Sequence, residues 1–142
     1  MEKRFTVPGE PVGKGRPRFS KTGNFVKTYT PEKTVSYENL VKIEYERQCG
    51  HEAFSKGVPL VMEIDAVFAI PKSAGKKRSR EMREDIIRPT KKPDVDNIMK
   101  IIADSLNGVA YYDDSQIVSG TVRKYYGETP KVYITIKENE HE

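Results

Sequence analysis

The sequence predicts a single small α/β domain spanning residues 1–142. A chain of this length suits one compact unit with one core. Apolar and polar residues alternate from Pro59 to Ile70, as in a half-buried strand, and apolar residues recur at helical spacing from Asp94 to Gly108. Only 36% of the residues are hydrophobic, so the core is expected to be lean, and pairing with a second copy would bury more surface.

Two strands and a loop are predicted before the first helix. Residues Lys3 to Val7 resemble a short strand. The segment 8–24 is so rich in Gly, Pro and basic residues that we expect an exposed loop throughout. Residues Asn24 to Tyr29 then predict a second strand.

The first helix is predicted to start with Thr30 as its N-cap and Pro31 at its first position. Gly50 is suited to end it, because glycine tolerates the backbone that helix ends require. One side of this helix carries Tyr37, Leu40, Val41, Glu44 and Tyr45.

The middle of the chain combines a strand with a basic connector. The strand from Pro59 ends at Pro71, and residues 71–93 form a connector in which a short helix is expected around Ser79 to Ile87. The predicted buried face of the strand consists of Leu60, Met62, Ile64, Ala66, Phe68 and Ile70.

An amphipathic helix and a hairpin complete the predicted elements. The helix closes with Asn107-Gly108 as its C-cap. Residues Ile117 to Tyr126 and Lys131 to Lys137 are rich in strand formers and flank a four-residue turn, which favours an antiparallel hairpin. The apolar side of the helix carries Val95, Ile98, Ile101, Ile102 and Leu106.

Basic residues are concentrated in two segments. The net charge is only +4, but Lys and Arg far outnumber acids from Met1 to Tyr29 and from Lys72 to Lys92. Such segments attract a polyanion by neutralising phosphates and releasing counterions; a solvated loop is the ordinary alternative. The candidate DNA-binding residues are Lys14, Arg16, Arg18, Lys76, Lys77, Arg88, Lys91 and Lys92.

Several classes of protein are disfavoured. No apolar run approaches the roughly 20 residues of a membrane span, and no signal peptide is visible, so a cytoplasmic protein without membrane contact is expected. Gly15 stands where a phosphate-binding Walker loop needs Ser or Thr, which argues against a nucleotide cofactor. The single cysteine, Cys49, is expected to be structural, and neither His51 nor His141 has metal-ligand or catalytic-triad spacing.

Four acids flank the amphipathic helix: Asp94 and Asp96 before it, Asp113 and Asp114 after it. Two residues in a helix are about 200° apart, so Asp94 must lie at or before the cap if both carboxylates are to approach one ion. Acids at a helix N-terminus also stabilise its dipole, so each one alone has an ordinary structural explanation.

The functional interpretation is that these carboxylates converge on Mg²⁺ or Mn²⁺, hard ions that prefer oxygen ligands. Lys100 lies on one helical stripe with Asp96 and Asp104, where it would neutralise charge on a scissile phosphate or fix the carboxylates. A calcium EF-hand is excluded, because Ser105 replaces the bidentate Glu and the loop glycine is missing.

The string KPDVDNIMKIIADSLNGVAYYDDSQI, residues 92–117, resembles the signature of the RusA family of Holliday-junction resolvases. It combines P-D-x-D-N-x-x-K, D-x-L-N-G and D-D-x-Q-I in order, and GKGRPR at 13–18 and YTPEKT at 29–34 resemble the N-terminal part of the family. The resemblance implies a mixed sheet with flanking helices in an intertwined homodimer. Pro93 departs from the family, in which a basic residue precedes the first Asp.

The resemblance also implies a Mg²⁺-dependent endonuclease that cuts two opposed strands of a four-way DNA junction in recombination and repair. Asp94, Asp96 and Asp114 match the essential acids, which would bind the metal, and Lys100 matches the catalytic lysine. Asp113 is expected to assist as a ligand, directly or through water. The alternatives are a nuclease of flaps or forks, a noncatalytic DNA-binding module, and a phosphohydrolase of free nucleotides, which the broad basic segments disfavour.

Overall fold

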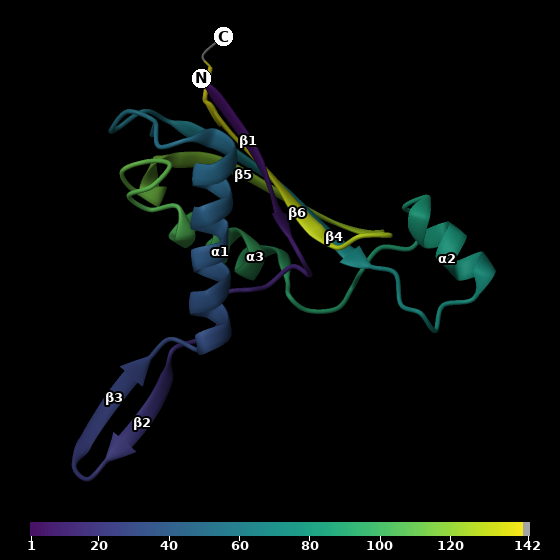
Figure 1. Cartoon of the computed structure of the whole chain (residues 1–142), viewed down its shortest axis with the longest axis horizontal. Helices are drawn as coiled ribbons and strands as arrows, with labels where there is room; N and C mark the ends of the chain where they lie inside the picture. Colours follow the sequence, from purple (N-terminus) through teal and green to yellow (C-terminus); the bar gives the residue numbers. More distant parts are fainter. Residues whose placement is uncertain (141–142) are drawn as a thin grey trace.

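A four-stranded sheet forms the centre of the computed structural model, which describes residues 1–140 (Figure 1). His141 therefore lies outside the described residues. The strands lie in the order β1-β6-β4-β5, with β6 antiparallel to both neighbours and β4 parallel to β5. This confirms the predicted small α+β domain with a mixed sheet. The strand bounds are Glu2–Pro8 for β1, Leu60–Ala69 for β4, Ile117–Gly127 for β5 and Lys131–Glu138 for β6.

The predicted hairpin of β5 with β6 is wrong, because β4 lies between these two strands. Alternate residues of β4 are fully buried from Leu60 to Phe68, and β6 buries Val132, Ile134 and Ile136. No residue of β5 is buried to that extent. The most apolar strands therefore take the interior positions, and β5 takes the edge beside β4, where less apolar surface needs covering.

Two helices pack side by side on one face of the sheet (Figure 1). Helix α1 (Glu32–Cys49) lies against β1, and α3 (Val95–Ser105) lies against β5. The core between helices and sheet includes Phe5, Tyr37, Val41, Tyr45, Met62, Ile64, Ile98, Ile101, Ile102, Leu106, Ile134 and Ile136.

The helix boundaries differ slightly from those predicted. Pro31, rather than Thr30, is the N-cap of α1, and Gly50 ends the helix at a positive φ as expected. Leu106 is the C-cap of α3, one residue before the predicted Asn107-Gly108 pair. Val95 was predicted on the buried side but is 48% exposed, because it opens the helix before the chain has reached the core.

Two arms extend from this body in different directions, one downward to the left and one to the right (Figure 1). One is a hairpin of β2 (Arg18–Thr22) and β3 (Phe25–Tyr29), so the loop predicted for 8–24 is wrong beyond Pro17. Its tight turn is Gly23-Asn24, with Gly23 at a φ of 61°. This residue pair is typical of a hairpin turn, but the surrounding basic, Gly- and Pro-rich sequence is typical of a loop.

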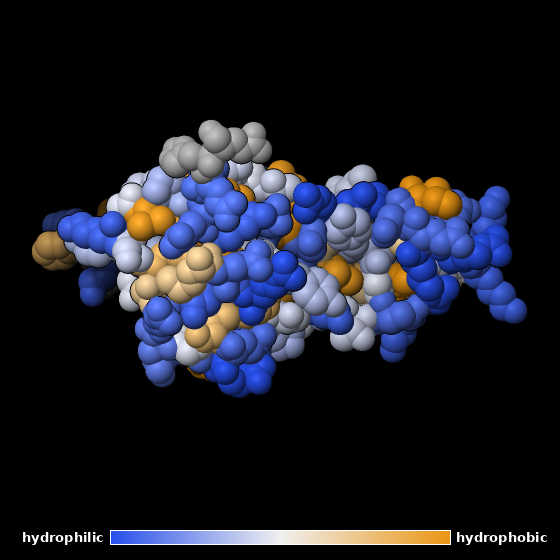
Figure 2. Space-filling model, turned by 90° about the horizontal axis from the view of Figure 1, so that it is seen from above, coloured by the Kyte–Doolittle hydropathy of each residue, from blue (hydrophilic) through white to orange (hydrophobic). Residues whose placement is uncertain are grey.

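The second arm carries α2 (Lys76–Arg83), which begins and ends earlier than the predicted Ser79–Ile87 helix. Met82 is its only buried residue, and an ion pair of Arg83 with Glu128 also joins this helix to the end of β5. Seen from above, the surface is largely hydrophilic from the body out to this arm on the right (Figure 2). Within residues 1–140, no helix combines the length and apolarity of a membrane span.

Candidate active site

Asp94 and Asp96 lie at the start of α3. Asp94 is the N-cap residue with an extended backbone, as predicted, and its side chain makes no capping hydrogen bond. Asp96 is exposed in the first turn. Within the described part of the chain, no Lys, Arg or His lies within 4.0 Å of either carboxylate. Both acids stabilise the positive end of the helix dipole and remain open to an added cation.

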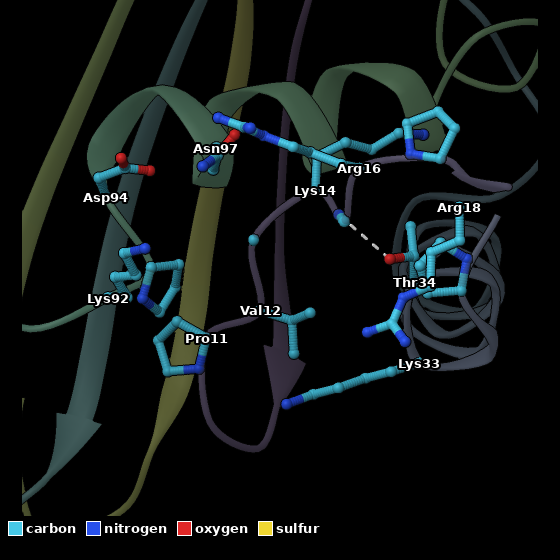
Figure 3. Close-up of a pocket in the computed structure, with 15 residues that line it drawn as sticks. Pro11, Val12, Lys14, Arg16, Arg18, Lys33, Thr34, Lys92, Asp94 and Asn97 are labelled. Carbon is cyan, nitrogen blue, oxygen red and sulfur yellow. Dashed lines mark hydrogen bonds between the residues drawn. The ribbon is translucent and has the colours of Figure 1, made fainter.

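The loop from Gly9 to Pro17 ties the starts of α1 and α3 together. The Lys14 amide donates to the Asn97 carbonyl at 3.1 Å, and the Gly15 amide donates to the Thr34 hydroxyl at 3.1 Å (Figure 3). A Cβ on Gly13 would lie 2.8 Å from the Pro93 Cβ. The glycines of the GKG motif therefore permit a close backbone approach to both helices.

Replacing Gly15 with Ala is expected to destabilise the protein. The added Cβ would lie 2.5 Å from the Oγ1 of Thr34, which is buried and bonded to the same loop. We expect a loss of roughly 1–3 kcal/mol in the free energy of unfolding, typical of overpacking, measured by urea denaturation. Gly75→Ala is the control, because a Cβ there meets no atom within 4 Å. Equal stability of both variants would contradict the close packing of Gly15.

A surface pocket of about 560 Å³ lies between this loop, the start of α1 and residues 92–97. Asp94 lines one side of it (Figure 3). Within residues 1–140, none of its four exposed cations has a carboxylate within 4.0 Å. Sequence reasoning missed one of them, Lys33, although it lies within the YTPEKT segment. The four cations are Arg16, Arg18, Lys33 and Lys92.

Lys14 differs from these cations because it is already paired. Its ammonium lies 3.1 Å from a Glu38 oxygen and 3.2 Å from an Asp104 oxygen, and so bridges α1 and α3. Burial lowers the pKa of Lys14, but the hydrogen bonds and charges of the two carboxylates outweigh it, and the net shift is upward. A DNA phosphate at Lys14 would compete with these two contacts.

Asp113 and Asp114 lie near the other end of α3. Asp113 caps the short 3₁₀ helix Asp114–Gln116 by accepting a hydrogen bond from the Ser115 amide. Hydrogen bonding with the Ser115 side chain, and then with its amide, lowers the pKa of Asp113. The Asp114 amide donates to the Asn107 Oδ1 at 2.7 Å, which ties this short helix to the end of α3. Burial raises the pKa of Asp114, as do Asp104 and Asp113, against the effect of Asn107.

Asp114→Asn is therefore expected to stabilise the metal-free protein at neutral pH. The pKa of Asp114 is higher in the folded state than in the unfolded state, so at a pH above the ordinary carboxyl pKa its negative charge destabilises the fold. The neutral side chain of Asn removes this charge. The gain in melting temperature should shrink as pH falls and the carboxyl becomes protonated. Melting curves from pH 7 to pH 3 in EDTA test this; an equal or larger gain at pH 3 would contradict it.

The two pairs of acids lie at opposite ends of α3 within one chain. Asp104, which contacts Asp114, is ten residues beyond Asp94, and a rise of 1.5 Å per residue separates them by roughly 15 Å. No three Asp, Glu, His or Cys side chains gather at a metal-binding distance among the described residues. Lys100 is exposed on α3 between the two ends. One copy of the chain therefore does not bring Asp94, Asp96 and Asp114 together.

The remaining predicted basic residues lie along the connector. Lys76 and Lys77 are exposed on α2. The Arg88 guanidinium lies 4.1 Å from the Tyr125 ring centroid, and the Lys91 carbonyl accepts a hydrogen bond from Lys124 at 2.6 Å. Arg88 and Lys91 are thus held against β5.

Lys124 is a neighbour of Asp94 that sequence reasoning did not identify. Burial lowers the pKa of Lys124, Asp94 raises it, and Lys91 lowers it, with a net downward shift. No local pattern signals this proximity, because it depends on β5 lying parallel beside β4.

Comparison with known proteins identifies the family to which this chain belongs. The family model described as Endodeoxyribonuclease RusA matches residues 8–137. The uncharacterized protein YqaN of Bacillus subtilis (strain 168) is 39% identical over 137 residues, which are 95% of each chain. The crossover junction endodeoxyribonuclease rusA of Lactococcus phage r1t is 29% identical over 139 residues, 97% of this chain and 98% of that protein. With its D-x-D-N motif at the start of α3, the chain therefore belongs to the RusA endodeoxyribonuclease family.

Proposed function

We propose that this protein is a Mg²⁺-dependent endonuclease that resolves four-way DNA junctions by paired symmetrical cuts, in DNA recombination and repair. The observation that carries the proposal lies at the start of α3, where Asp94 lines a pocket with four cations and Asp96 follows in the first turn of the helix. Among residues 1–140, neither these acids nor these four cations have an ion-pair partner within 4.0 Å. Acids that can hold a metal and cations that can hold phosphates are the two requirements of metal-dependent phosphodiester hydrolysis. Family membership supports DNA as the substrate.

The donor set fits Mg²⁺, with Mn²⁺ as a possible substitute, because it consists of carboxylate oxygens. The clearest fit is at Asp114, where burial and neighbouring acids raise the pKa, so that an added cation would relieve both the desolvation and the repulsion. Asp94, Asp96 and Asp114 would hold the metal, and Asp113 would assist. Bound Mg²⁺ would supply an attacking water of lowered pKa and charge stabilisation at the scissile phosphate.

Two copies of the chain are required by this proposal. Paired cuts need two sites, and the roughly 15 Å along α3 between Asp94 and Asp104 prevents one chain from placing Asp94 and Asp114 on the same ion. We therefore propose a homodimer in which Asp94 and Asp96 of one copy and Asp114 of the other complete each site. Mixed dimers test this arrangement directly.

The basic residues would bind the DNA backbone around each site. Arg16, Arg18, Lys33 and Lys92 line the pocket beside Asp94, and the connector adds further exposed cations up to Lys76 and Lys77 on α2. Lys100, exposed between the two acid pairs, would neutralise charge on the phosphate during cutting. Such contacts choose DNA by the position of its backbone rather than by its bases.

The experiment that tests the proposal is cleavage of a synthetic four-way junction with and without Mg²⁺, beside linear duplex, flap and fork DNA. We expect paired, symmetrical nicks in the junction that disappear in EDTA. Equal or better cutting of flaps or forks would replace the junction with those substrates. Binding without cutting of any DNA, by folded protein in Mg²⁺ or Mn²⁺, would reject the nuclease proposal in favour of a noncatalytic DNA-binding module.

A further inference from the structure

The pocket beside Asp94 has a size that suits one nucleotide. Its volume of about 560 Å³ falls in the range of roughly 300–1,000 Å³ typical of small-molecule sites. A base pair stacked within a duplex cannot enter a site of this size, whereas a single extruded base can.

The charge around the pocket suits a nucleotide phosphate. Lys33 in the first turn of α1 and Lys92 just before Asp94 approach the pocket from different sides (Figure 3). Arg16 and Arg18 add two guanidinium groups from the loop and the start of β2. Because these cations have no carboxylate partner within 4.0 Å among residues 1–140, they are available to phosphate oxygens.

The walls between these cations are apolar. Pro11 and Val12 lie between Lys92 and Lys33 in Figure 3, and Pro31 and Pro93 add further surfaces without hydrogen-bond donors. Apolar surface of this kind packs favourably against the hydrophobic face of a base. It makes no favourable contact with inorganic phosphate, which has no apolar surface.

The pocket is formed before any ligand binds. Pro11 is buried, and the backbone hydrogen bonds of Lys14 and Gly15 hold the loop to α3 and α1. Little conformational entropy is then lost when the pocket is filled, which favours binding.

We infer that this pocket receives one unstacked nucleotide of the cleaved strand, beside the scissile phosphate. The inference rests on the proposed function and extends it to the choice of substrate. A base that is unpaired or poorly stacked is extruded at lower cost, so a branch point supplies such a nucleotide more readily than continuous duplex does. The pocket would then favour branched DNA over linear duplex.

The test uses junctions with 2-aminopurine at each position flanking the branch point, bound by the full-length Asp96→Asn variant without cutting. The fluorescence of this base rises when it leaves the stack. We expect a rise at one flanking position on each cleaved strand, and a loss of at least half of it when Val12→Phe, added to the same background, fills the pocket. Thermal melting and junction affinity check that this variant is folded and still binds.

Lys33→Ala provides a second test that leaves the pocket wall unchanged. We expect a smaller fluorescence rise and a salt dependence of binding reduced by about one unit in the log–log slope. Lys42→Ala is the matched control, since nine residues of helix place it on the opposite side of α1 from Lys33, outside the pocket. Both measurements should be unchanged in the control.

The outcomes separate this inference from the proposed function. No rise at any flanking position, or the same rise with Val12→Phe and Lys33→Ala, would overturn the nucleotide pocket even if the wild-type protein cuts junctions. A rise that both variants reduce, in a protein that cuts no DNA, would support the pocket as a binding site and reject the nuclease.

Discussion

Replacing Asp96 with Asn is expected to lower the rate of junction cutting by at least about 100-fold, because even residues that only support metal ligands typically contribute 10- to 100-fold. Asn keeps the shape of the side chain but removes the charge that would hold the metal. Asp96 is exposed and unpaired at the start of α3, so its replacement should cost the fold only about 0.3–1 kcal/mol of helix-dipole stabilisation.

Binding of the junction by Asp96→Asn should persist and become slightly tighter without metal, because one negative charge near the phosphates is removed. Asp65→Asn is the control, because it makes the same chemical change on β4. Asp65 lies between two buried residues of this strand and so points to the opposite face of the sheet. Single-turnover cutting and equilibrium binding should be measured on one junction. Normal cutting by Asp96→Asn would remove this residue from the proposed metal site.

Mixing the inactive variants Asp96→Asn and Asp114→Asn is expected to restore nicking. In the proposed dimer, each site takes Asp96 from one copy and Asp114 from the other. A mixed dimer of the two variants then has one site in which both acids are replaced and one site in which both are intact. Equal amounts of the two chains place roughly half of the dimers in the mixed form. Restored single nicks without paired cuts are therefore the expected result, measured on a junction labelled on each strand.

A mixture of Asp94→Asn with Asp96→Asn is the matched control for this experiment. Both acids lie at the same end of α3, so a mixed dimer would still lack one of them at each site. Nicking should stay absent. If verified mixed dimers of Asp96→Asn and Asp114→Asn also fail to nick, each chain supplies its own acids, and the two ends of α3 must approach by a change of conformation.

Local sequence patterns predicted the parts of the fold that depend on neighbours along the chain. The alternation from Leu60 to Phe68 predicted β4, and the helical spacing from Ile98 to Leu106 predicted α3. The position of Asp94 at the cap followed from the rotation between successive helical residues. The β2–β3 hairpin was not predicted, because the Gly, Pro and basic residues before it are typical of a loop and only the Gly23-Asn24 turn indicates a hairpin.

The site was predicted only in part, because its geometry depends on packing. The family motif identified the acids, but not that roughly 15 Å along α3 separates Asp94 from the end that carries Asp104 and Asp114. The GKG motif suggested a DNA-binding loop, yet Lys14 is paired with Glu38 and Asp104. Lys33 lies at the pocket because the start of α1 packs there, a position that no local pattern indicates.

Residue types and local spacing are enough to identify most elements, the concentration of positive charge and the family. These depend on residue types and on periodicities of two or 3.6 residues, which act between close neighbours. The strand order, the neighbours of Asp94 and Lys14, and the proximity of Asp114 to Asp104 depend instead on how distant segments pack. Strands compete for the buried interior of the sheet, and β4 and β6 occupy it because they bury the most apolar surface.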